Sequence, residues 1–335
     1  MELIDLTLIW VVIIGIGVFM YVLMDGFDLG VGILFPFAPD DRARDEMMNS
    51  VAPVWDGNET WLVLGGAGLL AAFPLIYAVF LPALYIGVFL LLAGLIFRGV
   101  AFEFRFKSGE SRHWWDRAFF GGSTVAAFAQ GAVVGAYIQG FEVEGFSYVG
   151  GPLDWLTPFT VMTGLGVVAG YALLGATWTI LKTEGPTRDW ARRIAPRLLG
   201  AVMVFFLLVS LWTPLASEHV RERWFDHVSA IWIFPALTIV FAGWVYRKLG
   251  RHSDSAPFIG SMALFALFYG GLLISMWPYA VPPEHTFWDA ASAPGSQLFL
   301  LLGVLFLIPI ILIYTAWSYW VFRGKVSADS GYAGH

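Results

Sequence analysis

The chain has 335 residues, of which 58% are hydrophobic and only 13% are charged. Soluble domains carry about 25% charged residues, so this composition, with repeated apolar runs of about twenty residues, excludes an ordinary soluble protein and predicts a polytopic membrane protein. The chain has no cysteine, which excludes disulfides, iron–sulfur clusters and thiolate ligation of haem. The net charge of −6 says little, because charge placement matters more than the sum in such a protein.

We expect an all-α fold with one membrane domain over residues 1–335 and nine membrane-spanning helices. The first apolar run follows MELIDL, which lacks the basic region of a signal peptide, so we expect a retained span. The predicted spans are 6–35, 57–78, 81–104, 117–139, 156–181, 196–216, 228–248, 256–279 and 296–322.

The apolar stretch from Trp61 to Phe97 has no polar interruption. As one helix it would be ~55 Å long, almost twice the ~30 Å of a bilayer's hydrocarbon core. The stretch therefore predicts two spans joined by a tight turn. Pro82 is the expected break, because proline disrupts the interior of a helix.

The basic residues give the expected orientation. Of the 19 Lys and Arg residues, all but Arg221 and Arg223 fall in or next to the segments that follow the first, third, fifth, seventh and ninth spans. All of these segments lie on the side of the membrane opposite to the N-terminus. The positive-inside rule then places the N-terminus outside and the C-terminus in the cytoplasm. Fusing the 61–97 run into one span would put the later basic loops on the wrong side.

Two glycine motifs in the first two spans indicate close helix packing. Gly26 and Gly30 form a G-x-x-x-G motif, which allows another helix to approach closely. WLVLGGAGLLAAF lies inside the second span, so it favours helix packing over a phosphate-binding loop.

Carboxylates near the inner end of the first span are the first candidate site. Asp25 and Asp28 are spaced i, i+3, so on a helix they share one face with Tyr21. Asp25 would lie ~28 Å along the helix from Leu6, near the far interface of the bilayer. Ionisable residues in a span are expensive unless they are paired, hydrated or neutralised, so they indicate a function or a partner.

A second carboxylate cluster begins the second span. Asp56 and Glu59 follow Pro53, and the connection from the first cluster is short enough for the two clusters to meet. Arg98 and Glu103, at the inner end of the third span, can join them. Glu103 lies five residues beyond Arg98, so these two are poorly placed to pair on one helix.

These clusters support two interpretations. Facing carboxylates can form a hydrated inlet that relays protons from the cytoplasm. Alternatively, Asp56 and Glu59 favour the dipole of a helix N-terminus and cap its free N–H groups. In that structural interpretation, Asp25 and Asp28 pair with Arg98 or Arg44 to fix the fold.

The histidines argue against haem ligation by this chain. All six lie in loops, at span ends or in the tail, namely His113, His219, His227, His252, His285 and His335. Haem in a membrane bundle usually needs His, Met or Cys ligands from facing helices. We therefore expect no haem or metal ligand here, and the methionines favour a packing role.

The motifs MDGFDLGVG, NSVAPVWDGNETWL, FRGVAFEFR, MWPYAVPP, FWDAASAPGSQL and YTAWSYWVF resemble subunit II of the cytochrome bd quinol oxidases. They run from the first span to the ninth, so the resemblance covers nearly the whole chain. The short 217–227 connection resembles the cyanide-insensitive branch of the family.

This resemblance implies a heterodimer in the bacterial cytoplasmic membrane with a haem-bearing subunit I. The complex oxidises quinol and reduces dioxygen to water, taking protons from the cytoplasm and separating charge without pumping. Haems b and d lie in the partner subunit, and each subunit has two four-helix bundles plus one peripheral helix. Membrane lipids and a small single-helix subunit are further partners in the family, and nucleic acid is not. Some members hold a structural quinone, whose contacts this sequence does not assign.

The resemblance also implies roles for individual residues. The aspartate of W-D-G-N marks the cytoplasmic mouth of a proton path in the family, which corresponds to Asp56 here, with Trp55 beside it. Asp25 and Asp28 match the family motif and line or brace the same path. The expected supporting residues are Asn58, Glu59, Arg98 and Glu103.

Two alternatives of other classes remain. A proton-coupled secondary transporter would place carboxylates near the bilayer midplane and use broken helices in two repeats. The chain could also be a purely structural scaffold, which is compatible with everything except the motif match.

Overall fold

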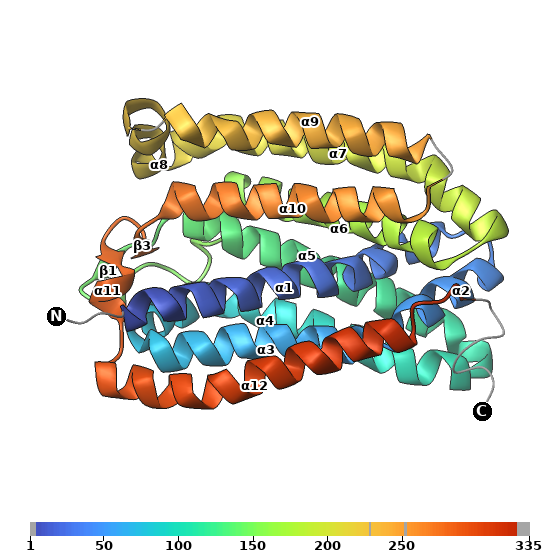
Figure 1. Cartoon of the computed structure of the whole chain (residues 1–335), viewed down its shortest axis with the longest axis horizontal. Coiled ribbons are helices and arrows are strands. Elements are labelled where there is room, and N and C mark those ends of the chain that lie inside the picture. Colours follow the sequence, from blue (N-terminus) through green and yellow to red (C-terminus); the bar gives the residue numbers. More distant parts are fainter. Residues whose placement is uncertain (1–4, 228, 251–252, 327–335) are drawn as a thin grey trace.

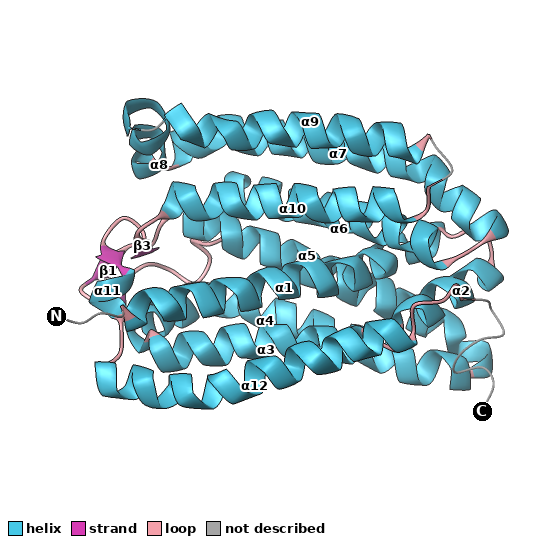
Figure 2. Ribbon diagram, in the orientation of Figure 1, coloured by secondary structure: helices cyan, strands magenta, loops and turns pink. Residues whose placement is uncertain are grey.

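The computed structural model describes residues 5–227, 229–250 and 253–326. This part of the chain is almost entirely helical, and the long helices run side by side along one axis (Figures 1 and 2). The long helices are α1 (Leu6–Leu34), α3 (Trp55–Ala72), α4 (Pro74–Phe104), α5 (Arg112–Gln139), α6 (Pro158–Lys182), α7 (Gly185–Ala216), α9 (Ile233–Leu249), α10 (Ser255–Met276) and α12 (Pro294–Val321).

Short elements lie at the two ends of the long helices (Figure 1). The short helices are α2 (Asp41–Val51), α8 (Glu218–Glu222) and α11 (Phe287–Ala290). Two antiparallel two-stranded sheets are formed by β1 (Val143–Glu144) with β2 (Ser147–Tyr148), and by β3 (Tyr279–Val281) with β4 (His285–Thr286). Tight 3-10 or π turns cover Phe35–Phe37, Arg105–Lys107, Gly109–Ser111, Arg223–His227 and Ser229–Trp232.

Helix length and composition confirm a multi-pass membrane protein. Among the described residues, seven helical segments are long and apolar enough to cross a bilayer, and they contain α1, α4, α5, α6, α7, α10 and α12. The remaining two long helices are shorter, since α3 has 18 residues and α9 has 17. For α3 and α9, membrane spanning stays a prediction.

In chain order, the first group of long helices is α1, α3, α4 and α5, and the second is α6, α7, α9 and α10. That these groups form two separate four-helix bundles stays a prediction, because α6 also makes extensive contacts with α1 and α5. Helix α12 lies outside both groups and contacts α3 and α1 (Figure 1). The groups join where α6 packs against α1 and α5, so α1 lies at the centre of the assembly.

The predicted break at Pro82 is wrong. The apolar stretch divides at Phe73, whose φ of −133° and ψ of 62° lie outside the helical region, and α4 begins at Pro74. Proline disfavours helical geometry in the preceding residue, whereas it fits the first turn of a helix, where its missing N–H costs nothing. Pro82 lies inside α4 on its exposed face, and the helix continues through it.

Other boundaries also differ from those predicted. Helix α7 begins at Gly185 instead of residue 196, so its first turns include the basic stretch that we expected to be a loop. The expected loop between the first two spans contains α2. Among the residues named above, His252 and His335 lie outside the described part of the chain.

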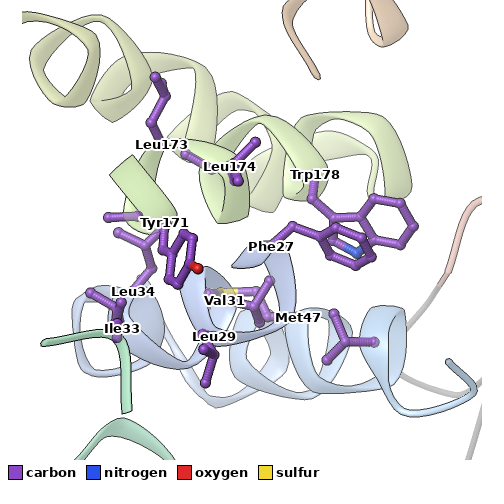
Figure 3. Close-up of a cluster of buried hydrophobic side chains, with 14 of the residues drawn as sticks. Phe27, Leu29, Val31, Ile33, Leu34, Met47, Tyr171, Leu173, Leu174 and Trp178 are labelled. Carbon is purple, nitrogen blue, oxygen red and sulfur yellow. The ribbon is translucent and has the colours of Figure 1, made fainter. Parts of the chain in front are cut away.

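The central contact is made by aromatic and aliphatic side chains of α1, α2 and α6. Phe27 stacks on Trp178 with ring centroids 4.1 Å apart, and both belong to a cluster of buried side chains that includes Met47 of α2 (Figure 3). Leu29 and Val31 are fully buried on α1. This core fixes the inner end of α1, which carries the predicted carboxylates.

The G-x-x-x-G prediction is confirmed on α1. A Cβ atom at position 30 would lie 1.8 Å from the backbone oxygen of Tyr171 and 2.7 Å from the backbone nitrogen of Gly175. At position 26, a Cβ would lie 2.8 Å from the Tyr171 ring. The backbones of α1 and α6 therefore touch at Gly30, and no other residue type fits there.

Replacing Gly30 with alanine should separate α1 from α6. We expect Gly30→Ala to destabilise the protein by at least the ~1–3 kcal/mol typical of overpacked cores, since the obstacle is backbone. Gly200→Ala on α7 is the matched control, because nothing lies within 4 Å of a Cβ added there. Thermal melting of the purified protein should show a large loss for position 30 only, and equal melting temperatures would contradict this packing.

Candidate functional site

Arg98 of α4 is the centre of a buried ionic cluster. Its side chain has no exposed surface, and its Nη1 donates to Oδ1 of Asp25 at 2.5 Å. Its Nη2 donates to Oε1 of Glu59 on α3. One guanidinium therefore ties together α1, α3 and α4.

Aromatic rings form one wall of this cluster. Trp55 stacks on Phe102 with centroids 5.0 Å apart, and the guanidinium of Arg98 lies 5.8 Å from the centre of the Trp55 ring. Such rings exclude water and attract a cation electrostatically. Glu59 is the open side of the cluster, since 26% of its side chain is exposed.

A second polar chain leads from α1 to the end of α12. Asn58 donates through Nδ2 to Oδ2 of Asp28 at 2.6 Å and to the backbone oxygen of Met24 at 3.3 Å. The hydroxyl of Tyr319 donates to Oδ1 of Asn58 at 2.9 Å. A small crevice between α3 and α12, lined in part by Gly57, reaches this pair. Asp28 is thus connected to a surface crevice through neutral side chains.

A third polar group extends inward from the cluster. Tyr21 lies one turn before Asp25 on α1, and its hydroxyl accepts a hydrogen bond from Nε2 of Gln130 at 3.0 Å. The hydroxyl of Tyr171 donates to Oε1 of the same Gln130 at 2.6 Å. Polar groups of α1, α5 and α6 therefore continue the cluster between the two helix groups.

The cluster has more carboxylates than cations. Asp25, Asp28 and Glu59 face a single guanidinium, and both aspartates are fully buried. One oxygen of each aspartate, Oδ2 of Asp25 and Oδ1 of Asp28, is buried without a hydrogen-bond partner among the described residues. Because uncompensated buried charge is expensive, such a group is suited to exchanging a proton.

The predicted site residues divide into two sets. Six of them come together in the cluster or on its wall, namely Asp25, Asp28, Trp55, Asn58, Glu59 and Arg98. Asp56 lies exposed in the first turn of α3 and forms no ion pair with a described residue. Glu103 is also separate, because it is half-exposed and pairs with Lys107 at 3.6 Å.

The structural interpretation is partly correct. Asp25 pairs with Arg98 as expected, whereas Arg44 pairs with Asp41 at 2.6 Å. The predicted capping of α3 is wrong, because its N-cap residue is Val54 and no side chain caps the helix by a hydrogen bond. Glu59 instead forms an ion pair with the buried guanidinium of Arg98.

Sequence reasoning missed Tyr319 and Gln130. Both are polar residues inside long apolar helices, which was the available signal, but neither is charged and their partners lie far away in the sequence. Tyr319 reaches Asn58 across 261 positions. Pairings of this kind follow from the packing of α12 and α5, which periodicity does not reveal.

The chain after α12 is fastened to the helix bundle by two lysines. Lys182 donates through Nζ to the backbone oxygens of Phe322 and Gly324, and its own oxygen accepts from the backbone N–H of Val326 at 2.8 Å. Lys325 donates to Oδ2 of Asp254 at 2.7 Å. This clasp, defined as Lys182, Lys325 and Asp254, holds the end of α12 and therefore Tyr319.

Asp254 in the clasp is held ionised by its neighbours. Burial alone would raise the pKa of Asp254, but hydrogen bonds from Lys325 and Arg192 outweigh that effect, so its pKa is lowered below the usual value of 3.8. Arg192 donates to Oδ1 at 2.5 Å. The stabilisation is therefore complete above the ordinary pKa and is lost as the pH falls through the lowered one.

The described residues contain no group of three or more His, Asp or Glu side chains arranged to hold a metal ion. The described histidine rings lie near helix ends. His113 and His285 contact backbone oxygens there, and His219 packs edge-on against Tyr279. The site is therefore a set of acids, amides and one guanidinium.

Comparison with known proteins decides the family. The sequence profile of cytochrome bd terminal oxidase subunit II matches residues 6–322. The chain belongs to this family. Subunits II of this type are parts of quinol oxidases in the bacterial cytoplasmic membrane. This chain is therefore a multi-pass protein of that membrane and a subunit of a quinol oxidase.

Individual relatives match over almost their whole length. The chain is 32% identical to a cytochrome bd-I ubiquinol oxidase subunit 2 of Escherichia coli K12, with 97% of this chain and 96% of the relative covered. It is 29% identical to a cytochrome bd ubiquinol oxidase subunit 2 of Bacillus subtilis 168, with 96% of each covered.

A solved structure shows the same fold. A chain of the bd oxidase from Geobacillus thermodenitrificans superposes with a TM-score of 0.73 at 19% identity, covering 93% of this chain and 98% of that one. The helix arrangement of this cytochrome bd subunit is therefore that of a known oxidase chain.

Removing the guanidinium should be severe. Arg98→Ala leaves Asp25 buried without its cation, and breaking such a pair typically costs about 3–5 kcal/mol. Arg44→Ala is the control, because an exposed pair contributes about 0–1 kcal/mol. Melting of the purified oxidase complex measures both, and a melting temperature for Arg98→Ala equal to that of the control would refute a central role for Arg98.

Acid should open the clasp. A spin label on Gly324→Cys, in a chain without other cysteines, should stay immobile at neutral pH and become mobile only below about pH 4, where Asp254 takes up a proton. Asp254→Asn should be mobile throughout this range. Mobility that rises between pH 6 and 8 would contradict the assignment, and the complex without the introduced cysteine corrects for labelling elsewhere.

Proposed function

We propose that this chain is the haem-free subunit II of a cytochrome bd-type oxidase. In this proposal, a haem-bearing subunit I oxidises quinol and reduces dioxygen to water, and the two chains form a heterodimer. The main support is the family match over residues 6–322, together with a buried carboxylate cluster that opens at one end of the bundle. Subunit II would stabilise its partner and supply a proton inlet.

The proposal includes nine spans with the N-terminus outside and the C-terminus in the cytoplasm. Helices α3 and α9 are not among the seven strongly apolar segments, but they run beside them along the same axis (Figure 1). In the described part of the chain, almost all basic residues lie in or next to the helix ends on the side of the bundle where α2 and the end of α12 are found (Figure 1), which supports a cytoplasmic position for that end.

The described residues do not fit a haem. Among the described side chains, His113, His219 and His285 lie near helix ends, and the chain has no cysteine. Axial ligation inside a membrane bundle usually takes ligands that project from facing helices. We therefore assign haems b and d to the partner subunit and route no step of the chemistry through this chain.

The proposed inlet begins at Asp56. This carboxylate is exposed in the first turn of α3, and Glu59 lies three residues further along the same helix face. Glu59 is only partly exposed and contacts Arg98, which in turn contacts Asp25. An exposed acid followed by a half-buried one and a fully buried one is the order expected of a group that collects protons and passes them inward.

Arg98 and Asn58 would keep this inlet specific for protons. The guanidinium compensates part of the negative charge and repels other cations that enter the cluster. Asn58 holds Asp28 from one side and accepts from Tyr319 on the other, so a proton could also be exchanged through the crevice beside α12. The excess of carboxylates over cations leaves the cluster able to take up a proton.

A proton-coupled transporter fits the structure less well. Such proteins place broken helices around a site near the bilayer midplane. Helix α1 runs without interruption through both Asp25 and Asp28, and the cluster lies toward the end of the bundle where α2 is found. The continuous helix and the family match both favour the oxidase.

Neutralising Asp56 should slow the oxidase without dismantling it. We expect Asp56→Asn to lower quinol oxidase turnover by about tenfold or more, because the proton-collecting carboxylate is lost. The matched control is Glu103→Gln, an exposed carboxylate near the same end that lies outside the cluster. Oxygen consumption measures turnover, and the visible spectrum of the purified complex measures its haem content.

Two results would refute this inlet. Full turnover in Asp56→Asn would show that protons enter elsewhere. Loss of haem and of the partner subunit in that variant would assign Asp56 to assembly instead. Glu59→Gln gives a second test, since Glu59 lies between the surface and Arg98, and it should slow turnover as well.

A further inference from the structure

The outward face of α9 carries a groove far from the ionic cluster. An open depression of about 560 Å³ on the surface is lined, among the described residues, by Ile239, Val240, Gly243, Trp244, Arg247 and Lys248 of this helix. Helix α9 lies at the opposite side of the bundle from α12 (Figure 1). The groove is therefore separate from the proposed proton inlet and from the crevice beside Tyr319.

The groove changes from apolar to cationic along its length. Ile239 and Val240 are 63% and 65% exposed and form the apolar end. Gly243 leaves the middle open, since nothing lies within 4 Å of a Cβ added there, and Trp244 forms a wall. Positions 239 to 248 extend over ~13 Å of helix, which is the length of a glycerol unit with the first part of an acyl chain.

The cationic end lacks acidic partners. Arg247 and Lys248 form no ion pair with any described carboxylate, and Nζ of Lys248 lies 5.5 Å from the centre of the Trp244 ring. Asp254, the acid that follows α9, is already engaged by Arg192 and Lys325. Two cations beside an indole at a helix end therefore remain available to an anion.

We infer that the α9 groove binds an anionic phospholipid, with its phosphate between Arg247 and Lys248 and an acyl chain along Ile239 and Val240. Basic groups at the cytoplasmic end of a span attract anionic headgroups, and an indole ring sits well at the level of the headgroups. The apolar end could not accommodate a free phosphate or a polar ligand. An anionic phospholipid has its charged and apolar parts in the same order as the groove.

This inference uses only one part of the proposed function, namely that α9 lies in the bilayer with its Arg247 end at the cytoplasmic interface. It is independent of the proton inlet. Its test measures lipid binding, so failure of the lipid site and failure of the inlet are distinguishable.

Photoreactive lipids test the site directly. The purified complex is placed in nanodiscs of phosphatidylcholine that contain a small fraction of photoreactive phosphatidylglycerol or photoreactive phosphatidylcholine, and crosslinked peptides are mapped by mass spectrometry. We expect phosphatidylglycerol to label α9 in preference to phosphatidylcholine. Unlabelled phosphatidylglycerol should compete with the photoreactive lipid and reduce the labelling of α9. Arg247→Gln and Lys248→Gln should each raise the concentration of unlabelled lipid needed for this reduction about fivefold.

Two further variants separate the groove from simple surface charge. Gly243→Leu keeps both cations but fills the groove, so it should remove the preferential labelling. Arg117→Gln is the matched control, because Arg117 also lies over an indole ring, 4.7 Å from the centre of Trp114, but does not line the groove. Unchanged haem spectra and melting temperatures show that each variant is folded.

Each outcome of the labelling experiment either supports or overturns the lipid site. Preferential labelling of α9 that is lost with Gly243→Leu and with the two charge variants, but not with Arg117→Gln, supports the site. Equal labelling by the two lipids overturns it. Crosslinks from α9 to another protein chain, or unchanged labelling in Gly243→Leu, also overturn it, because another occupant or charge alone would then explain the surface.

Discussion

One buried guanidinium holds together the part of this protein that contains the proposed proton inlet. Arg98 is fully enclosed between α1, α3 and α4, and it contacts carboxylates from two of these helices. An isolated charge in that position would be strongly unfavourable, so the three helices are stable in this arrangement only with the pair intact. The close contact of α1 with α6 at Gly30 then sets how the second helix group lies against the first.

The same cluster joins stability to the proposed proton uptake. The carboxylates that secure Arg98 outnumber it, and the hydrogen-bond chain through Asn58 and Tyr319 reaches a crevice beside α12. Helix α12 is mostly exposed along its length, and the clasp around Lys182 holds the chain that follows it. The geometry at Tyr319 is therefore sensitive to a segment that lies outside the cluster.

The sequence predicted the helical membrane class, the packing role of Gly30 and the meeting of Asp25, Glu59 and Arg98, because apolar length, small residues and rare charges are local signals. It misplaced the break in the 61–97 run, because the geometry that proline imposes on the preceding residue decided in favour of Pro74 over Pro82. Tyr319 and Gln130 could not be found in this way, since neutral polar residues in apolar helices gain their meaning only from distant partners. The sequence also suggested that Asp56 and Glu59 cap the N-terminus of α3. No side chain caps that helix, and Glu59 pairs with Arg98 instead.

The central claim is that Arg98 and Asp25 depend on each other, and a double-variant cycle tests it most directly. Arg98→Met leaves Asp25 buried without its cation, whereas Asp25→Leu leaves Arg98 with Glu59 as its remaining carboxylate partner. The double variant contains neither member of the Arg98–Asp25 pair. Melting of the purified complex should show that the double variant loses much less stability than the sum of the single variants, with a coupling of about 2 kcal/mol or more. Losses that simply add would show that the two side chains act independently and would contradict the account.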